Sequence, residues 1–212
     1  MRKNTLCGMI ALAMLLFPLH AVLAASNSLI DQVTTPLHPI LQQLHAKTYN
    51  ATAQGKTYTD KKNGFSLTLP TGWKKITTPA NSIFAAQPTN NIDAELLLTM
   101  TKYKTQKQAN AANTSITKNP KNFGKLLLKG FQAEFPTGNC ILKTALKKNL
   151  GGKVGTRANV NCVLGTTSYT LSTFAFVHKL TYYAFVDLAP TSQFSGLLPK
   201  FDAIIASMKF TK

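Results

Sequence analysis

A short stretch that begins at residue 63 limits the folds that this chain of 212 residues can adopt. Asn63 and Gly64 form a turn signal, because both residue types tolerate a positive φ angle. Residues 65–69 then alternate apolar and polar side chains, and Pro70 ends the run because proline donates no hydrogen bond to a ladder. The alternation predicts a strand with one buried face. Trp73, the only tryptophan, is expected to fill an edge of the core.

The order G-F-x-L-x-L-P-x-G-W in this stretch resembles the entry hairpin of the PsbP-like superfamily, named after an extrinsic subunit of photosystem II. The end of the chain is similar to the closing helix and the final Ser-x-x-aromatic segment of the same family. The residues that carry this second similarity are Phe201, Ile204, Ile205, Ser207 and Phe210. The resemblance implies an α+β fold, an α/β/α sandwich around a central, mostly antiparallel sheet. Many members of the family are non-catalytic binders or assembly factors, so it also implies a binding role.

Residues 1–24 are predicted to be a signal peptide. Arg2 and Lys3 form a positive n-region, the mostly apolar segment 6–23 follows, and Val-Leu-Ala at 22–24 fits a small-residue cleavage site. A membrane anchor is the alternative, but a proline and a histidine interrupt the apolar segment. We therefore expect a secreted bacterial protein, located in the periplasm or outside the cell.

The rest of the chain is expected to form one PsbP-like domain, residues 57–212, behind an N-terminal extension and linker at 25–56. Within the extension, residues 38–47 predict a short helix and residues 48–56 a polar linker. The extension either packs on the domain or serves as a partner segment.

Several further elements follow from local patterns. We expect strands at 74–76, 82–86, 94–104, 168–177 and 180–188. The last two carry large apolar residues on both sides, which implies cover on both faces of their sheet. The polar segment 105–119 is interpreted as a loop or a weak helix. A C-terminal helix is expected around an apolar stripe from Phe194 to Ile205, either kinked or started at Pro199.

The charge of the chain is strongly positive. It holds 24 lysine and arginine residues against 7 acids, a formal net charge of +17. After the signal peptide, Arg157 is the only arginine. Lysine lacks the bidentate fork of arginine, so we expect diffuse attraction to anionic surfaces and no sequence-specific reading of nucleic acid. The alternative is that the charge serves solubility or reflects base composition.

The first lysine cluster lies on a predicted helix that begins at Pro120. Its apolar residues recur at helical spacing and are expected to face the core: Phe123, Leu126, Leu127, Phe131 and Phe135. Lys121, Lys125 and Lys129 fall on another face. Like charges at this spacing repel by roughly 0.2–0.5 kcal/mol per pair. The row therefore faces an anionic partner or is simply a solvated helix face.

Cys140 and Cys162 are the only cysteines beyond the signal peptide, which predicts one disulfide in an exported chain. Folding the chain about Gly151 sets them opposite each other, because both lie eleven residues from it. A bulge at the glycines would shift this register by one. The core side of this hairpin is expected to hold Cys140, Leu142 and Leu146 on the first strand and Val154, Val160, Cys162 and Leu164 on the second. Two buried free thiols are the alternative, and a metal site is disfavoured because no further cysteine or histidine lies close in sequence.

The second lysine cluster belongs to this hairpin. Its outward side is expected to show Lys143, Lys147, Arg157, Asn159 and Asn161, with Lys148 and Lys153 beside the tip. Clustered lysines of this kind suit an anionic phospholipid surface.

No catalytic motif occurs in the sequence, and we predict neither an enzyme nor a cofactor or metal. The histidines after the signal peptide are His38, His45 and His178, which make an incomplete ligand set. Asp187 and Asp202 are interpreted as surface or capping carboxylates.

The leading prediction is a secreted, non-catalytic binding module that docks on phospholipid or another polyanion. Its candidate binding residues are Lys121, Lys125, Lys129, Lys143, Lys147, Lys148, Lys153 and Arg157. The alternative is a periplasmic or envelope assembly factor with a protein partner, which an exposed apolar patch would mark. A small hydrolase or redox enzyme is a third hypothesis.

Overall fold

The computed structural model describes residues 55–79, 81–91 and 93–211, and the predicted signal peptide and most of the N-terminal extension lie outside them. The strands are β1 (Thr57–Asp60), β2 (Phe65–Thr68), β3 (Trp73–Lys75), β4 (Phe84–Pro88), β5 (Glu95–Lys102), β6 (Asn139–Leu150), β7 (Lys153–Leu164), β8 (Thr167–His178), β9 (Thr181–Pro190) and β10 (Lys209–Phe210). The helices are α4 (Gln106–Lys118), α5 (Pro120–Glu134) and α6 (Thr191–Ser207).

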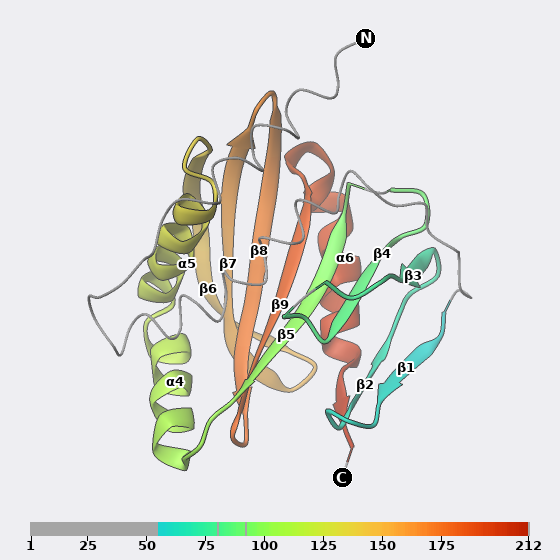
Figure 1. Cartoon of the computed structure of the whole chain (residues 1–212), viewed down its shortest axis with the longest axis vertical. Coiled ribbons are helices and arrows are strands. Elements are labelled where there is room, and N and C mark those ends of the chain that lie inside the picture. The colour runs from blue at the N-terminus through green and yellow to red at the C-terminus, as the bar shows by residue number, and fades with distance from the viewer. Residues whose placement is uncertain (1–54, 80, 92, 212) are drawn as a thin grey trace.

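These elements form an α/β/α sandwich around a seven-stranded sheet in the order β3-β4-β5-β9-β8-β7-β6 (Figure 1). A second sheet has the order β1-β2-β10. Every strand pairing is antiparallel. The expected fold class is confirmed.

Both faces of the large sheet are covered. One core lies under α4 and α5, and the other lies between the sheet, α6 and the small sheet. Leu97 belongs to the first core, whereas its neighbours Leu96 and Leu98 belong to the second. Because each face is buried, β5 needs no alternation of apolar with polar residues.

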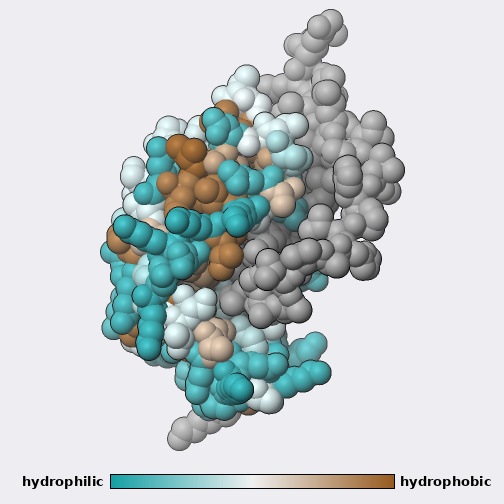
Figure 2. All heavy atoms as spheres, turned by 90° about the vertical axis from the view of Figure 1, so that its left-hand side faces the viewer, coloured by the Kyte–Doolittle hydropathy of each residue, from teal (hydrophilic) through white to brown (hydrophobic). Residues whose placement is uncertain are grey.

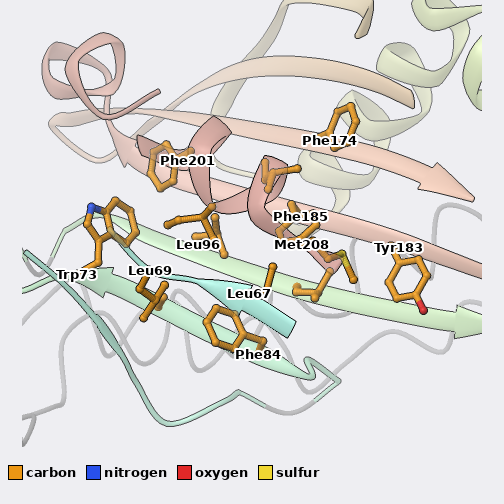
Figure 3. Close-up of a cluster of buried hydrophobic side chains, with 14 of the residues drawn as sticks. Leu67, Leu69, Trp73, Phe84, Leu96, Phe174, Tyr183, Phe185, Phe201 and Met208 are labelled. Carbon is orange, nitrogen blue, oxygen red and sulfur yellow. The ribbon is translucent and has the colours of Figure 1, made fainter. Parts of the chain in front are cut away.

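The entry strand behaves as its pattern predicts. Phe65, Leu67 and Leu69 are buried on one side, and Gly64 adopts a φ angle of 70° in the preceding turn. Trp73 meets Phe201 of α6 edge to face, with ring centroids 5.3 Å apart (Figure 3). The segment that follows the entry strand and the closing helix are therefore in direct contact within one core.

The structure decides two alternatives about helices that the sequence leaves open. Of the two alternatives for the segment 105–119, the helix is correct: α4 fills most of it and begins with a capping box between Thr105 and Gln108. Its buried face is made of small residues and Ile116, so the apolar stripe is weak in the sequence. Helix α6 begins at Thr191, so Pro199 lies inside it and not at its start. None of the described helices is long and apolar enough to cross a membrane.

Candidate functional site

The hairpin of β6 and β7 contains the predicted disulfide. Gly151 and Gly152 form a two-residue turn with φ angles of 58° and 82°, and Leu150 pairs with Lys153. Such a turn alone would set Cys140 opposite Val163. A bulge between Leu142 and Thr144 shifts the register by one, so Cys140 pairs and bonds with Cys162. The disulfide is confirmed, but the irregularity lies at Lys143 and not at the glycines.

The same bulge changes which side chains of β6 face the core. Beyond it, Ala145 packs towards α5, and Leu146 is 55% exposed on the other side of the sheet. Val154 lies beside the hairpin tip and is 42% exposed. The expectation that Leu146 belongs to the core is therefore wrong, because one extra residue reverses the alternation along the rest of β6. The expectation is also wrong for Val154, although the bulge does not affect its strand and it alternates in phase with the buried Thr156, Ala158 and Val160 of β7.

Six of the eight candidate binding residues are exposed lysines on two neighbouring elements. Helix α5 packs closely on β6, since a Cβ atom at Gly124 would lie 2.7 Å from the Cβ atom of Ala145. The lysines of α5 lie on the side of the helix opposite its buried residues. The group, called the lysine surface below, consists of Lys121, Lys125, Lys129, Lys143, Lys147 and Lys148, all exposed. Figure 2 views the side of the molecule that carries α4 and α5.

Lys153 does not belong to this surface. It is buried, and its Nζ atom donates to the carbonyl oxygens of Gly151 at 2.9 Å, Met208 at 3.0 Å and Ala206 at 3.3 Å. Burial lowers the pKa of its ammonium group. The carbonyl groups of Ala206 and Met208 lie at the C-terminal end of α6. Lys153 therefore connects the hairpin tip to the closing helix through hydrogen bonds.

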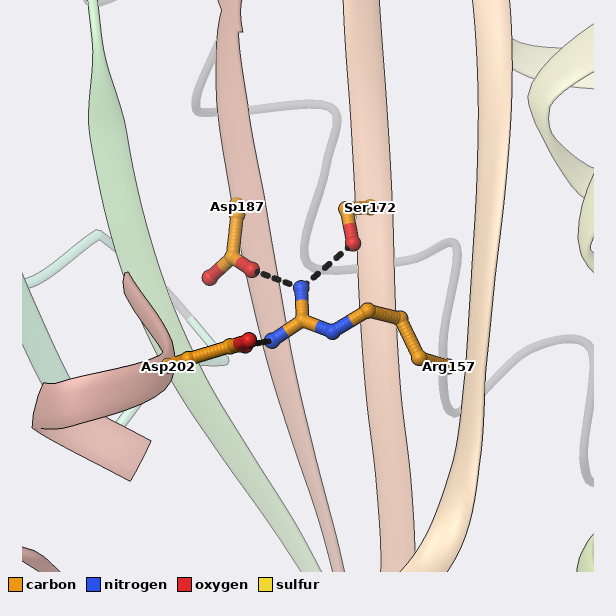
Figure 4. A network of polar contacts seen from close by, with 4 residues as sticks. All are labelled: Arg157, Ser172, Asp187 and Asp202. Atoms are coloured by element: carbon orange, nitrogen blue, oxygen red, sulfur yellow. Dashed lines mark hydrogen bonds and ion pairs between the residues drawn. The ribbon is translucent and has the colours of Figure 1, made fainter. Parts of the chain in front are cut away.

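Arg157 does not belong to the lysine surface either. It is 5% exposed, and its Nη1 atom donates to Ser172 Oγ and to Asp187 Oδ2, both at 2.6 Å. Its Nη2 atom pairs with Asp202 of α6 (Figure 4). Arg157 therefore joins β7, β8 and β9 to α6, and the expectation of an outward-facing arginine is wrong.

Asp187 was expected to be an ordinary surface or capping carboxylate, yet it is fully buried. The signal that could have found it is its position in β9, where an acid stands among apolar residues of both parities. A buried acid in a central strand requires a cation, and Arg157 is the only arginine in the described part of the chain.

Burial raises the pKa of Asp187 from 3.8 to about 6, although Arg157 opposes this shift. A carboxyl group with a raised pKa binds more protons in the folded state, so the stability it contributes is lost as the pH rises through the folded value. We expect the difference in unfolding free energy between wild type and Asp187→Asn to change between pH 4 and pH 6, with wild type losing relative stability as the pH rises. Urea unfolding at several pH values measures this, and a constant difference would contradict it.

His178 is the only histidine among the described residues. His178 stacks on Phe210 with ring centroids 3.8 Å apart, and burial together with Lys179 and Lys153 lowers its pKa. No carboxylate in the described residues bonds to it. Those residues also contain no group of three or more acids, histidines and cysteines that could hold a metal ion. His38 and His45 lie outside them.

Apolar residues are exposed on the β6–β7 hairpin. Ile141 is 47% exposed, Val163 is 44% exposed, and the exposed Leu146 lies further along β6. By the pairing register, Ile141 and Val163 are diagonal neighbours on the hairpin. The hairpin therefore offers apolar contacts as well as charge.

Comparison with known proteins identifies the fold. No protein-family model matches the chain, and no curated protein matches it in sequence. Among solved structures, the cyanobacterial PsbP protein (CyanoP) of Synechocystis sp. PCC 6803 matches with a TM-score of 0.57 and 12% identity, over 78% of this chain and 98% of that one. The chain therefore has the PsbP-like fold that its sequence resemblance implies.

Two other solved structures match at lower TM-scores. A protein from Bacteroides thetaiotaomicron VPI-5482 gives 0.48 at 14% identity, over 76% of this chain and 50% of that one. LpqN, which is involved in cell envelope biogenesis of Mycobacterium tuberculosis, gives 0.46 at 11% identity, over 74% of this chain and 90% of that one. Likeness at these identities concerns the fold and not the activity.

Proposed function

We propose that this protein is a secreted, non-catalytic binding module that docks on anionic phospholipid surfaces through the lysine surface. The observation that carries the proposal is the exposure of six lysines on two neighbouring elements, three on α5 and three on β6. Glu134 is the only acid between residues 96 and 186, so this part of the chain is basic throughout. Each lysine near an anionic leaflet contributes on the order of 1 kcal/mol, so those that reach the same leaflet add up to several kcal/mol.

Two features of the chain support a binding role over a catalytic one. The buried acid Asp187 and the half-buried Asp202 both pair with Arg157. The lysine surface, in contrast, carries positive charge but no combination of a general acid, a general base and a nucleophile. The predicted signal peptide supports a location in the periplasm or outside the cell, where envelope lipids are within reach.

The proposal predicts that charge reversal on the lysine surface abolishes vesicle binding. One variant carries Lys121→Glu, Lys125→Glu and Lys129→Glu, and a second carries Lys143→Glu, Lys147→Glu and Lys148→Glu. At about 1 kcal/mol per lysine, each triple change should weaken binding to phosphatidylserine vesicles about a hundredfold in low salt. Co-sedimentation with the vesicles measures the affinity.

The matched control reverses three exposed lysines on other elements, Lys61, Lys62 and Lys200. It makes the same change in net charge but leaves the lysine surface intact, so we expect its affinity to remain within about threefold of wild type. If the control variant loses as much affinity as the two others, the binding depends on net charge and the assigned surface is wrong.

A second function remains a candidate because of the exposed apolar residues Ile141, Leu146 and Val163. Under this alternative the protein is an envelope assembly factor that binds another protein through the β6–β7 hairpin. Ile141→Ser combined with Val163→Ser should then weaken the protein complex and leave vesicle binding unchanged.

A further inference from the structure

Strand β6 is a long, open end of the large sheet. It has 12 residues and pairs with β7 on one side, whereas β3 at the other end of the sheet has 3 residues. No strand in the described part of the chain pairs with its outer side. The disulfide ties β6 to β7, and α5 packs against one of its faces, so the edge is held in an extended conformation.

The disulfide also shows which backbone groups point outward. Directly opposite residues of an antiparallel pair lie about 5.5 Å apart when they exchange hydrogen bonds and about 4.5 Å apart when they do not. The Cα atoms of Cys140 and Cys162 are 4.0 Å apart, so this pair does not exchange hydrogen bonds. Its backbone groups therefore point away from the partner strand. In agreement, the carbonyl oxygen of Cys140 accepts a hydrogen bond from Gln132 of α5 at 3.4 Å.

The alternation can be followed to the hairpin tip. Leu142, Ala145, Lys147 and Asn149 pair with every second residue of β7, in phase with the cysteine pair. Their N–H and C=O groups accordingly point to the open edge. Leu150 pairs with Lys153 across the two-residue turn, where a hydrogen-bonded pair is required, so the phase agrees at both ends.

The side chains along the edge divide into an apolar and a basic half. Ile141 and Leu142 lie on opposite faces near the start of β6, and Lys147 and Lys148 lie on opposite faces near the tip. Neither β6 nor β7 contains an acid. A strand added here would therefore meet apolar side chains at one end and two ammonium groups at the other.

We propose that the open edge of β6 binds an extended, acidic segment of another protein as an additional strand. In the antiparallel orientation that the whole sheet uses, acids would lie in the N-terminal half of the segment, beside Lys147 and Lys148. Apolar residues would follow in its C-terminal half, beside Ile141 and Leu142. The lysines repel a second copy of this chain, whose formal net charge is +17. This inference goes beyond lipid docking, because it requires the backbone of β6 as well as the lysines.

Residue-resolved amide hydrogen exchange tests the inference. The probe is a ten-residue peptide that alternates threonine with aspartate in its N-terminal half and threonine with valine in its C-terminal half. We expect it to slow the exchange of Leu142, Ala145, Lys147 and Asn149 at least tenfold. A peptide with the two halves exchanged should bind at least fivefold more weakly. Absence of protection at these four amides would overturn the inference, and so would protection that grows with protein concentration without peptide, because that indicates self-pairing.

Proline substitution separates strand addition from lipid docking. Asn149→Pro removes one outward N–H group at an exposed site, and Asn149→Ala is the matched control that keeps it. We expect Asn149→Pro to weaken peptide binding at least fivefold, with Asn149→Ala and phosphatidylserine vesicle binding unchanged. Ala145→Pro provides a second block in the middle of the edge. If both proline variants bind the peptide with the same affinity as wild type, the strand-addition proposal is wrong, whereas the proposal of lipid docking is not affected.

Discussion

Arg157→Met is expected to lower the free energy of unfolding by about 3–5 kcal/mol, the cost of leaving one member of a buried ion pair without its partner. The uncompensated group is Asp187, which is fully buried, whereas Asp202 is 36% exposed and can be solvated. Methionine is similar in length to the aliphatic part of arginine, so lost packing contributes little. Urea unfolding followed by the fluorescence of the buried Trp73 measures the change.

A second substitution identifies the cause. Asp187→Asn in the Arg157→Met background removes the buried charge and should recover at least half of the loss. Asp202→Asn alone should lower the free energy of unfolding by no more than about 1 kcal/mol, because Arg157 still forms its ion pair with Asp187. A cost below about 1 kcal/mol for Arg157→Met would show that the network does not hold α6 to the sheet.

Arg157→Met also tests whether Arg157 takes part in vesicle binding. Arg157 lies in the interior, so folded Arg157→Met protein should bind phosphatidylserine vesicles with an affinity within about threefold of wild type. A large loss of vesicle binding in folded protein would contradict the placement of Arg157 in a structural network.

Loss of the disulfide is expected to cost about 3 kcal/mol. The bond closes a loop with a sequence separation of 22, and the chain-entropy relation gives about this value for a loop of that length. Cys140→Ala with Cys162→Ala should therefore unfold at lower urea concentration than the oxidised wild type. Because the disulfide keeps β6 in register, the variant should also show faster amide exchange along β6.

Reduction of the wild type provides the control for lost packing. Dithiothreitol should bring its stability close to that of the double alanine variant and should leave the variant unchanged. If reduced and oxidised wild type differ by less than about 0.5 kcal/mol, the bond contributes little and β6 depends on α5 alone for its position.

The fold could be predicted from the sequence where a local pattern determines it. The alternation at 65–69 and the spacing of Phe123, Leu127 and Phe131 are such patterns, and their apolar side chains are buried as expected. The cysteine pairing was also correct, but for an incomplete reason. The two-residue turn and the bulge at Lys143 each move the register by one, and the two shifts cancel.

The sequence failed where the outcome depends on which element covers which face. Lys153 and Arg157 carry the same formal charge as their exposed neighbours, and only the position of α6 makes them buried. The capping box of Thr105 and Gln108, in contrast, was readable in the sequence and would have identified α4. The lysines of α5 and β6 were placed outside the core as expected, and their binding role remains a proposal.

If the lysine surface recognises anionic phospholipid, as we propose, the purified protein should bind anionic vesicles across a salt series. Heparin and RNA serve as competing polyanions. We expect binding to anionic vesicles to persist at an ionic strength of about 0.15 M and to exceed binding to either polyanion. Equal binding to all three that disappears as salt screens the charges would contradict it.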